Sequence, residues 1–386
     1  LLNSQISQTL LNILAPTINY KSTDIARIVV PESKYLEQAD KVVRNLVDIV
    51  KSDWDDIETS PDFSSLPMVR NSDKISMKTT YSFLRQLWVT STNSAKRLEE
   101  ENNSVFIEAF NVEEEFSPSL SLSEVTLTVN PTYRYGDGKT ESELESLLLR
   151  DTLCEYISYA IGCVMGRYSL DKTGLILANQ GDGIETYNKL VPEPRFMADA
   201  DGIIPILDDE WFPDDAIEQV KQFVKVTFGT EKYDENMQFI EESIGKNLRQ
   251  YLVKDFYPEH VKRYKKRPIY WLFTSPKGHF RALIYMHRYR PDTLSTMRNE
   301  YLQPFIAKLE DKKSHSENMI PRAQNDREKI ALQKDVERLS AMLADLREYE
   351  KKLTDVASRK IAIDLDDGVK VNYAKFSEVI AKVVGL

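Results

Sequence analysis

Apolar side chains recur at helical spacing through much of the first half of the chain. Residues Ser4–Leu14 are predicted to form a helix, and apolar residues at three- and four-residue steps from Leu36 to Val50 predict a longer amphipathic helix. A further helix is expected from about Thr79 to Phe110. Residues Glu141–Met165 are apolar around much of a helical circumference, so we expect this helix at the centre of a core.

The period of two that is typical of strands occurs only in short segments. Residues 24–30 and residues 124–129 each predict one short strand. Two aromatic and β-branched runs within residues 269–287 are joined by a Ser-Pro-Lys-Gly turn and predict a hairpin with basic residues at its base and edges. A last hairpin is expected within residues 361–373, before a short terminal helix. The predicted fold is therefore mostly α with small β hairpins or sheets, an α+β class.

A leucine-rich stripe marks the last long helix. Apolar residues from Leu332 to Ala357 follow alternating steps of four and three, which predicts a helix that packs along another helix. Residues Met297–Lys313 are the nearest candidate for an antiparallel partner. The alternative is that this stripe pairs with a different protein.

Composition restricts the class of protein. The chain has 386 residues, of which 41% are hydrophobic and 29% charged, enough for about two to three compact domains. It contains no run of about 18 apolar residues, so no membrane span is expected. Cys154 and Cys163 are the only cysteines and would lie on opposite faces of a helix, which favours a reducing, cytoplasmic location. Because the chain starts with Leu1, we expect it to be part of a longer or processed polypeptide.

Charge is distributed unevenly along the chain. The formal net charge of −10 disfavours a protein that coats nucleic acid with its whole surface. Residues 199–218 carry eight acids and no base, whereas residues 259–298 carry ten bases and two acids. The basic residues could form ion pairs with that acidic stretch, or they could contact the phosphates of DNA, with the interleaved aromatic rings packing or stacking. The candidate DNA-binding residues are Lys262, Arg263, Lys265, Lys266, Arg267, Lys277, Arg281, Arg288 and Arg290.

Motifs for catalysis are weak in this chain. Gly138-Lys-Thr140 lacks the upstream glycine of a phosphate loop, and Thr140 with Glu143 predicts a capping box instead. Asn130-Pro-Thr-Tyr133 is similar to the Asn-Pro-Pro-Tyr loop of amino-methyltransferases, but no glycine-rich cofactor turn precedes it. Gly181-Asp-Gly183 is the only later candidate for such a turn. The four histidines and two cysteines show no metal-ligand spacing, so we predict no catalytic, cofactor-binding or metal-binding residue here.

Five strings in the chain match one protein family. They are Thr126–Gly136, Tyr159–Asp171, Asp208–Asp215, Tyr264–Phe273 and Leu365–Tyr373. Together they resemble the C-terminal part of PglX, the family of adenine-specific DNA methyltransferases of BREX phage-defence systems. The resemblance implies a multidomain enzyme that transfers a methyl group from S-adenosylmethionine to N6 of adenine in a short DNA site. It also implies that the cofactor loop and the true Asn-Pro-Pro-Tyr lie upstream of Leu1, so that this chain is not catalytic by itself.

The resemblance suggests a division of the chain and a set of partners. Residues 1–31 resemble the tail of a target-recognition domain, residues 32–56 would form a spacer helix, and residues 57–258 a mainly helical C-terminal domain. Residues 259–386 would contain the basic hairpin, the long helix and the terminal hairpin. The expected partner is double-stranded DNA, and the intact enzyme would use S-adenosylmethionine. The alternative function is a protein-interaction module that docks other BREX proteins or a phage protein that mimics DNA.

Overall fold

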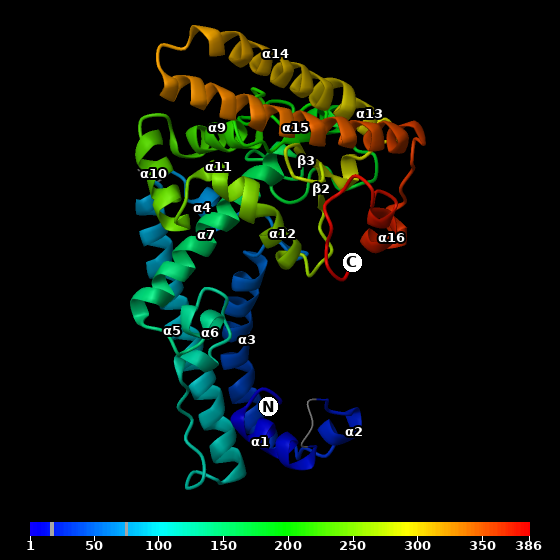
Figure 1. Ribbon diagram of the computed structural model, residues 1–386. Helices are drawn as coiled ribbons and strands as arrows, with labels where there is room; N and C mark the ends of the chain where they lie inside the picture. The colour runs from blue at the N-terminus through cyan, green and yellow to red at the C-terminus, as the bar shows by residue number, and fades with distance from the viewer. Residues whose placement is uncertain (16–18, 74–75) are drawn as a thin grey trace. The chain divides into compact units, whose positions relative to one another are not determined.

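The computed structural model describes residues 1–15, 19–73 and 76–386. The chain forms two compact units, Leu1–Thr152 and Leu153–Leu386. Figure 1 shows that most of the described residues lie in helices, and the strands among them form one three-stranded sheet. The predicted fold class, mostly α with small β elements, is confirmed.

The first unit is built on two long helices that pack along each other, α3 and α5. Ser76 starts α5, because its hydroxyl accepts a hydrogen bond from the Thr79 N–H at 3.3 Å, and Asn111 ends it with a left-handed φ of 56°. Ile6 of α1 and Phe106 of α5 belong to the small core of this unit. The predicted helices of this unit are confirmed. The elements are α1 (Gln5–Leu14), α2 (Ser22–Ile25), α3 (Ser33–Asp55), α4 (Pro67–Arg70), α5 (Met77–Phe110), the 3₁₀ turn η1 (Leu122–Glu124), α6 (Pro131–Tyr135) and the start of α7 (Glu141–Val164).

Neither strand predicted in the first unit is present. Residues 24–30 begin inside α2 and continue as a turn. In residues 124–129 the alternation does bury Val125 and Leu127, but the backbone has no neighbouring strand. The Asp53 carboxylate accepts instead from the Thr128 N–H at 2.7 Å and the Val129 N–H at 3.2 Å. A side chain therefore satisfies the donors that a strand would have paired with a sheet.

The second unit contains the sheet and most of the short helices. Strand β3 lies between β1 and β2, and both pairings are antiparallel. Tyr270 pairs with Tyr285 and Thr274 with Arg281, so the predicted hairpin is confirmed. The elements are the end of α7, α8 (Ile184–Leu190), β1 (Ile203–Pro205), α9 (Ala216–Phe228), α10 (Tyr233–Ile244), α11 (Leu248–Tyr251), the π-helical turn η2 (Leu252–Phe256), α12 (Tyr257–Arg263), β2 (Tyr270–Thr274), β3 (Arg281–Tyr285), η3 (Met286–Arg288), α13 (Thr293–Thr296), the π-helical turn η4 (Met297–Leu302), α14 (Gln303–Met319), η5 (Ile320–Arg322), α15 (Asp326–Ser358), η6 (Leu365–Asp367) and α16 (Gly368–Ala374).

A helical hairpin packs against the sheet. Helices α14 and α15 run side by side in opposite directions (Figure 1), as the leucine stripe predicted. Leu339, Leu346 and Leu353 of the stripe are fully buried. They share one core with Trp271 and Phe280 of the β2–β3 hairpin and with residues of α14. The buried leucines of the stripe are therefore covered by other residues of this chain.

The last predicted hairpin is wrong. Its supposed turn, Asp366-Asp-Gly368, belongs to η6 and to the first residue of α16. The Asp364 carboxylate accepts from the Asp366 N–H at 3.0 Å, and the Asn372 side chain bonds back to the Gly368 carbonyl at 3.0 Å. These side-chain bonds favour a helix start over a strand turn. The predicted terminal helix is also not formed, because residues after Ala374 make turns and a bridge between Ile380 and Phe273.

Candidate nucleic-acid interface

A cluster of exposed basic residues lies where α12 ends. Lys262 and Arg263 occupy the last turn of this helix, where carbonyl groups favour cations. Lys265 and Lys266 then adopt left-handed φ angles of 50° and 64°. Their N–H groups donate to the carbonyls of Lys262 at 3.0 Å and Val261 at 2.8 Å, so the turn is closed by its own backbone.

Two adjacent lysines in the left-handed region are unusual, because each costs about 1 kcal/mol or more compared with glycine. The turn leads from α12 into β2 and leaves the side chains of Lys262, Lys265, Lys266 and Arg267 exposed. We call these four residues the basic turn. None of the four forms an ion pair with any residue that the structure describes. Arg263, in contrast, is half-buried and has an interaction partner.

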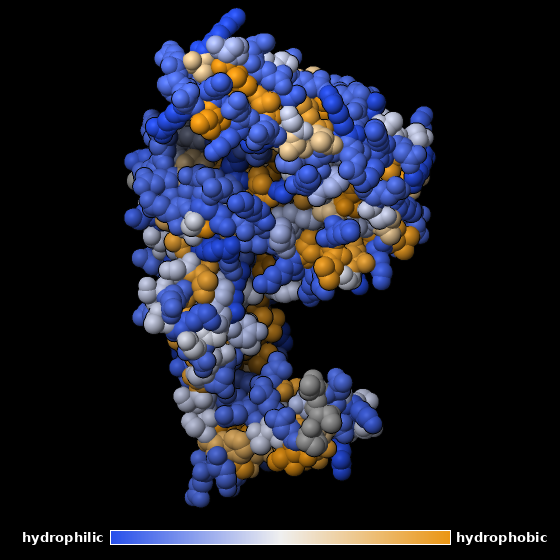
Figure 2. All heavy atoms as spheres, viewed as in Figure 1, coloured by the Kyte–Doolittle hydropathy of each residue, from blue (hydrophilic) through white to orange (hydrophobic). Residues whose placement is uncertain are grey.

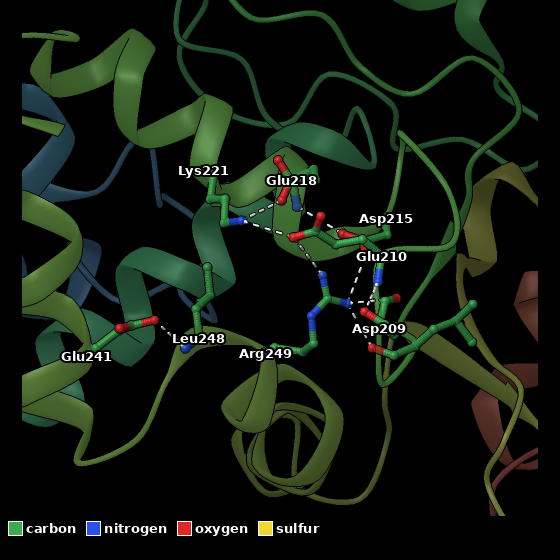
Figure 3. Close-up of polar contacts among 9 residues, drawn as sticks. Asp209, Glu210, Asp215, Glu218, Lys221, Glu241, Leu248 and Arg249 are labelled. Atoms are coloured by element: carbon green, nitrogen blue, oxygen red, sulfur yellow. Dashed lines mark hydrogen bonds and ion pairs between the residues drawn. The ribbon is translucent and has the colours of Figure 1, made fainter. Parts of the chain in front are cut away.

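Four acids of the stretch 199–218 pair with cations from outside residues 259–298, which we call the basic segment, and Figure 3 shows the pairs made by Arg249 and Lys221. Arg249 donates to the buried carboxylate of Asp215 at 2.9 Å. Lys221 lies 2.5 Å from Glu218 and 3.8 Å from Glu210. Lys312 lies 3.9 Å from Asp209. The interpretation that the basic segment exists to pair with these acids is therefore not supported for the basic turn.

Three of the predicted DNA-binding arginines bond to their own chain. Arg281 donates to the Val253 carbonyl. Arg288 is buried and donates to the carbonyls of Asp199 and Ala200, each at 2.8 Å. Arg290 donates to the Gly181 carbonyl at 3.2 Å, although its side chain is exposed. Burial lowers the pKa of the Arg288 guanidinium, which the neighbouring Asp199 and Asp201 partly offset. These arginines hold loops in place, and the structure does not bring them into the basic turn.

Lys277 lies apart from the basic turn, in the loop between β2 and β3. The five residues of β2 lie between the basic turn and the loop that contains Lys277, and an extended strand of this length spans roughly 17 Å. Asp345 of α15 fixes this loop: its carboxylate accepts from the Ser275 hydroxyl at 2.6 Å and from the Lys277 N–H at 3.1 Å. His279 Nδ1 lies 3.0 Å from the same carboxylate. The Lys277 side chain remains exposed.

Aromatic residues of the basic segment pack around His260, next to the basic turn. His260 is buried, and its Nε2 accepts from the Tyr270 N–H at 3.1 Å. Its ring centroid lies 4.7 Å from those of Tyr264 and Tyr270. Burial, with Arg263 and Arg167 nearby, lowers the pKa of His260 well below its usual range, so the imidazole is neutral. These rings pack against one another next to the exposed cations of the basic turn.

The motifs that resembled catalytic loops have structural roles. The Asn130 side-chain amide donates to the carbonyls of Leu122 at 2.7 Å and Val125 at 2.8 Å. Its oxygen caps α6. Lys139 donates to the Tyr135 carbonyl at 2.7 Å rather than into a phosphate loop. No group of three or more potential metal ligands occurs among the described residues.

The capping box predicted before α7 is confirmed. The Thr140 N–H donates to the Glu143 carboxylate at 2.8 Å, and the Glu143 N–H donates back to the Thr140 hydroxyl at 3.3 Å. The other glycine-rich candidate is also a turn, because Asp182 accepts from the N–H groups of Ala178 and Asn179.

The sequence did not lead us to predict two residues that anchor loops, Asp345 and Arg249. Asp345 could have been noticed, because Met342, Asp345 and Tyr349 follow three- and four-residue steps and an acid on a buried helix face needs donors. Arg249 had no such signal, since its partner Asp215 is distant in sequence and lies in an acidic run that we considered as a partner of residues 259–298.

No helix among the described residues is long and apolar enough to cross a membrane.

Comparison with known proteins gives relatives along nearly the whole chain. No family model matches. The adenine-specific methyltransferase BrxX of Escherichia coli O9:H4 (strain HS) is 35% identical over 401 residues, which cover 99% of this chain and 32% of the relative. The adenine-specific methyltransferase PglX of Lacticaseibacillus casei (strain Zhang) is 32% identical over 389 residues, which cover 97% of this chain and 30% of the relative. The chain spans about a third of the length of these curated relatives. Over nearly all of its own length it is homologous to one portion of two adenine-specific methyltransferases.

Proposed function

We propose that this chain is a DNA-binding, non-catalytic portion of an adenine-specific DNA methyltransferase of a BREX phage-defence system. The names of both relatives support the enzyme class. The intact enzyme would bind S-adenosylmethionine and transfer the methyl group with residues outside this chain. Within the chain, the side-chain amide of Asn130 is used to hold a turn, which agrees with a non-catalytic role.

The observation that carries the proposal is the basic turn. Four cations, Lys262, Lys265, Lys266 and Arg267, are exposed without a carboxylate partner among the described residues, on a backbone turn closed by hydrogen bonds. Lysine and arginine side chains placed in this way neutralise phosphate oxygens without reading base sequence. The turn would therefore position the duplex, while the choice of DNA site would lie with other residues.

The wild-type chain provides the first test of this proposal. Because bound phosphates release counterions, four contacts should give a slope of about −3 to −4 when log K is plotted against log salt concentration. Fluorescence anisotropy with a labelled duplex between about 50 and 200 mM salt measures this slope. Calorimetry with S-adenosylmethionine should show no heat of binding to this chain. Salt-independent duplex binding would contradict the phosphate contacts, and saturable cofactor binding would contradict the non-catalytic role.

The alternative function, a docking module for other BREX proteins or for a phage protein that mimics DNA, receives no support from the leucine stripe. Leu339, Leu346 and Leu353 are buried, so a partner helix would have to displace α14. A DNA mimic would instead use the basic turn and would compete with duplex DNA for it.

A further inference from the structure

The first unit contains a cavity of about 1270 Å³ that has one apolar and one polar wall. Helix α3 supplies the apolar wall with Val43, Leu46, Val47, Val50 and Trp54. Figure 2 shows apolar side chains gathered along α3. Val47 is 54% exposed and Trp54 49% exposed, so about half of each side chain is open to solvent. We call this cavity the α3–α5 groove.

The polar wall presents hydrogen-bond acceptors that have no donor. Glu99 and Asn102 of α5 and Gln5 of α1 line the groove. The side-chain oxygens Asn102 Oδ1 and Gln5 Oε1 are buried and accept no hydrogen bond, and Asn102 is only 6% exposed. The half-buried Glu99 carboxylate forms no hydrogen bond or ion pair with any described residue. Buried polar groups are nearly always paired, so the two buried oxygens without donors, next to the Glu99 carboxylate, indicate a missing donor-rich group.

Carboxylates outnumber basic side chains among the residues that line the groove. Glu124 also lines it, and hydrogen bonds from the Ser121 N–H and hydroxyl lower the pKa of Glu124, which keeps it ionised. Burial, followed by the charge of Glu124, raises the pKa of Glu99. Lys51 lies at the groove, but its ammonium is 3.8 Å from Asp62. The two carboxylates would repel a nucleic acid, and neither forms an ion pair with any described residue.

We propose that the α3–α5 groove binds a segment of a partner protein that inserts an arginine side chain between flanking aliphatic side chains. The guanidinium has five donors in a planar fork and no acceptor, which suits a wall of acceptors such as Glu99, Asn102 and Gln5. The aliphatic side chains would cover Val47, Val50 and Trp54. This inference does not depend on DNA binding by the second unit, and the partner is defined by chemistry alone.

The test uses the full chain and a matched pair of peptides. Both are capped amphipathic peptides of about twelve residues, with leucines around one central position that is arginine in the first and its neutral isostere citrulline in the second. Calorimetry measures the binding of each peptide. We expect the arginine peptide to bind about tenfold more tightly or better, because charge-assisted hydrogen bonds are roughly twice as strong as neutral ones.

Two variants, each of which removes one negative charge from α5, test where the arginine side chain binds. Glu99→Gln should weaken the arginine peptide about tenfold and leave the citrulline peptide unchanged, since only the carboxylate charge is removed. Glu101→Gln is the control, because Glu101 is exposed on the same helix and does not line the groove. Circular dichroism would verify that both variants are folded.

Several outcomes would overturn the proposal. They are equal affinity for the arginine and citrulline peptides, absence of binding by both, and an effect of Glu101→Gln as large as that of Glu99→Gln. Val47→Asn offers a second check on the apolar wall, since this exposed side chain can be changed without disturbing the core and the charge stays the same. The proposal requires that Val47→Asn weaken both peptides, and unchanged binding of both would contradict it.

Discussion

Replacing Arg249 with methionine is expected to lower the free energy of unfolding of the second unit by about 3–5 kcal/mol. Arg249 is the cationic partner of Asp215, whose side chain is fully buried. It also donates to the carbonyls of Leu207 at 3.0 Å and Asp209 at 3.1 Å, which fixes the loop that precedes α9. The substitution keeps the aliphatic volume but leaves a buried carboxylate without its counter-ion. Urea unfolding followed by circular dichroism measures the loss.

Two further variants separate the ion pair from the packing. In the double variant Arg249→Met, Asp215→Asn most of the lost stability should return, because asparagine still caps α9 through the Glu218 N–H but carries no charge. Lys221→Met is the control, since its pairs with Glu218 and Glu210 are partly exposed and should be worth no more than about 1 kcal/mol. Equal losses for Arg249→Met and Lys221→Met would contradict the buried pair.

Replacing Asp345 with alanine is expected to lower the free energy of unfolding by about 2–4 kcal/mol and to loosen the β2–β3 loop. The carboxylate accepts from the Ser275 hydroxyl and the Lys277 N–H and contacts His279, so these groups would lose a buried acceptor together. Trypsin should then cut after Lys277 faster than in the wild type, because the loop is no longer fixed to α15. Urea unfolding and limited trypsin digestion check the two effects.

A substitution on the exposed side of the same helix provides the control. Glu348 pairs with Lys352 one helical turn away, in an exposed pair at 2.7 Å. Glu348→Ala should change stability by less than about 0.5 kcal/mol and leave cleavage after Lys277 unchanged. If Asp345→Ala behaved like Glu348→Ala, the loop would not depend on α15.

The long helices could be predicted because their apolar stripes are local signals. The steps from Leu332 to Ala357 in α15 reflect burial on one helix face. The stripe from Leu36 to Val50 predicted α3 correctly, although only Ala39 of it is buried and Leu36 and Val50 remain exposed. The β2–β3 hairpin was predictable for a similar reason, since two apolar runs flank a tight turn. In each case one segment contains the whole pattern that determines its structure.

The failed strand predictions depended on partners distant in sequence. Residues 124–129 alternate correctly, yet the acceptor for their N–H groups is Asp53 on α3 rather than another strand. In residues 361–373 the side chains of Asp364 and Asn372 convert an apparent hairpin turn into a helix start. Alternating apolar and polar residues indicate which side chains are buried. A sheet also needs a neighbouring strand, and the sequence does not show whether a strand or a side chain will pair with the backbone of the segment.

The candidate site could be predicted only in part. Sequence located the cations of residues 259–298 but not the partner of each, so Arg288 and Lys265 looked equivalent. The structure separates them: Arg288 donates to backbone carbonyls, whereas Lys265 projects from a left-handed turn. Nothing in the order of residues signals two consecutive left-handed lysines, because that geometry follows from how α12 meets β2.

The most direct test of the proposed DNA contact removes three of the four charges of the basic turn without disturbing its backbone. The variant is Lys265→Gly, Lys266→Gly, Arg267→Ala, in which glycine accommodates the left-handed φ angles of 50° and 64°. The control is Arg327→Ala, Lys329→Ala, Lys334→Ala on α15, which removes the same charge from exposed positions without an ion pair among the described residues.

The measurement is the slope of log K against log salt concentration for duplex DNA. We predict that the basic-turn variant makes this slope shallower by about 2 to 3 and that the control variant leaves it unchanged. If the two variants gave the same slope as the wild type, or if both made it equally shallower, the basic turn would not be the surface that contacts DNA.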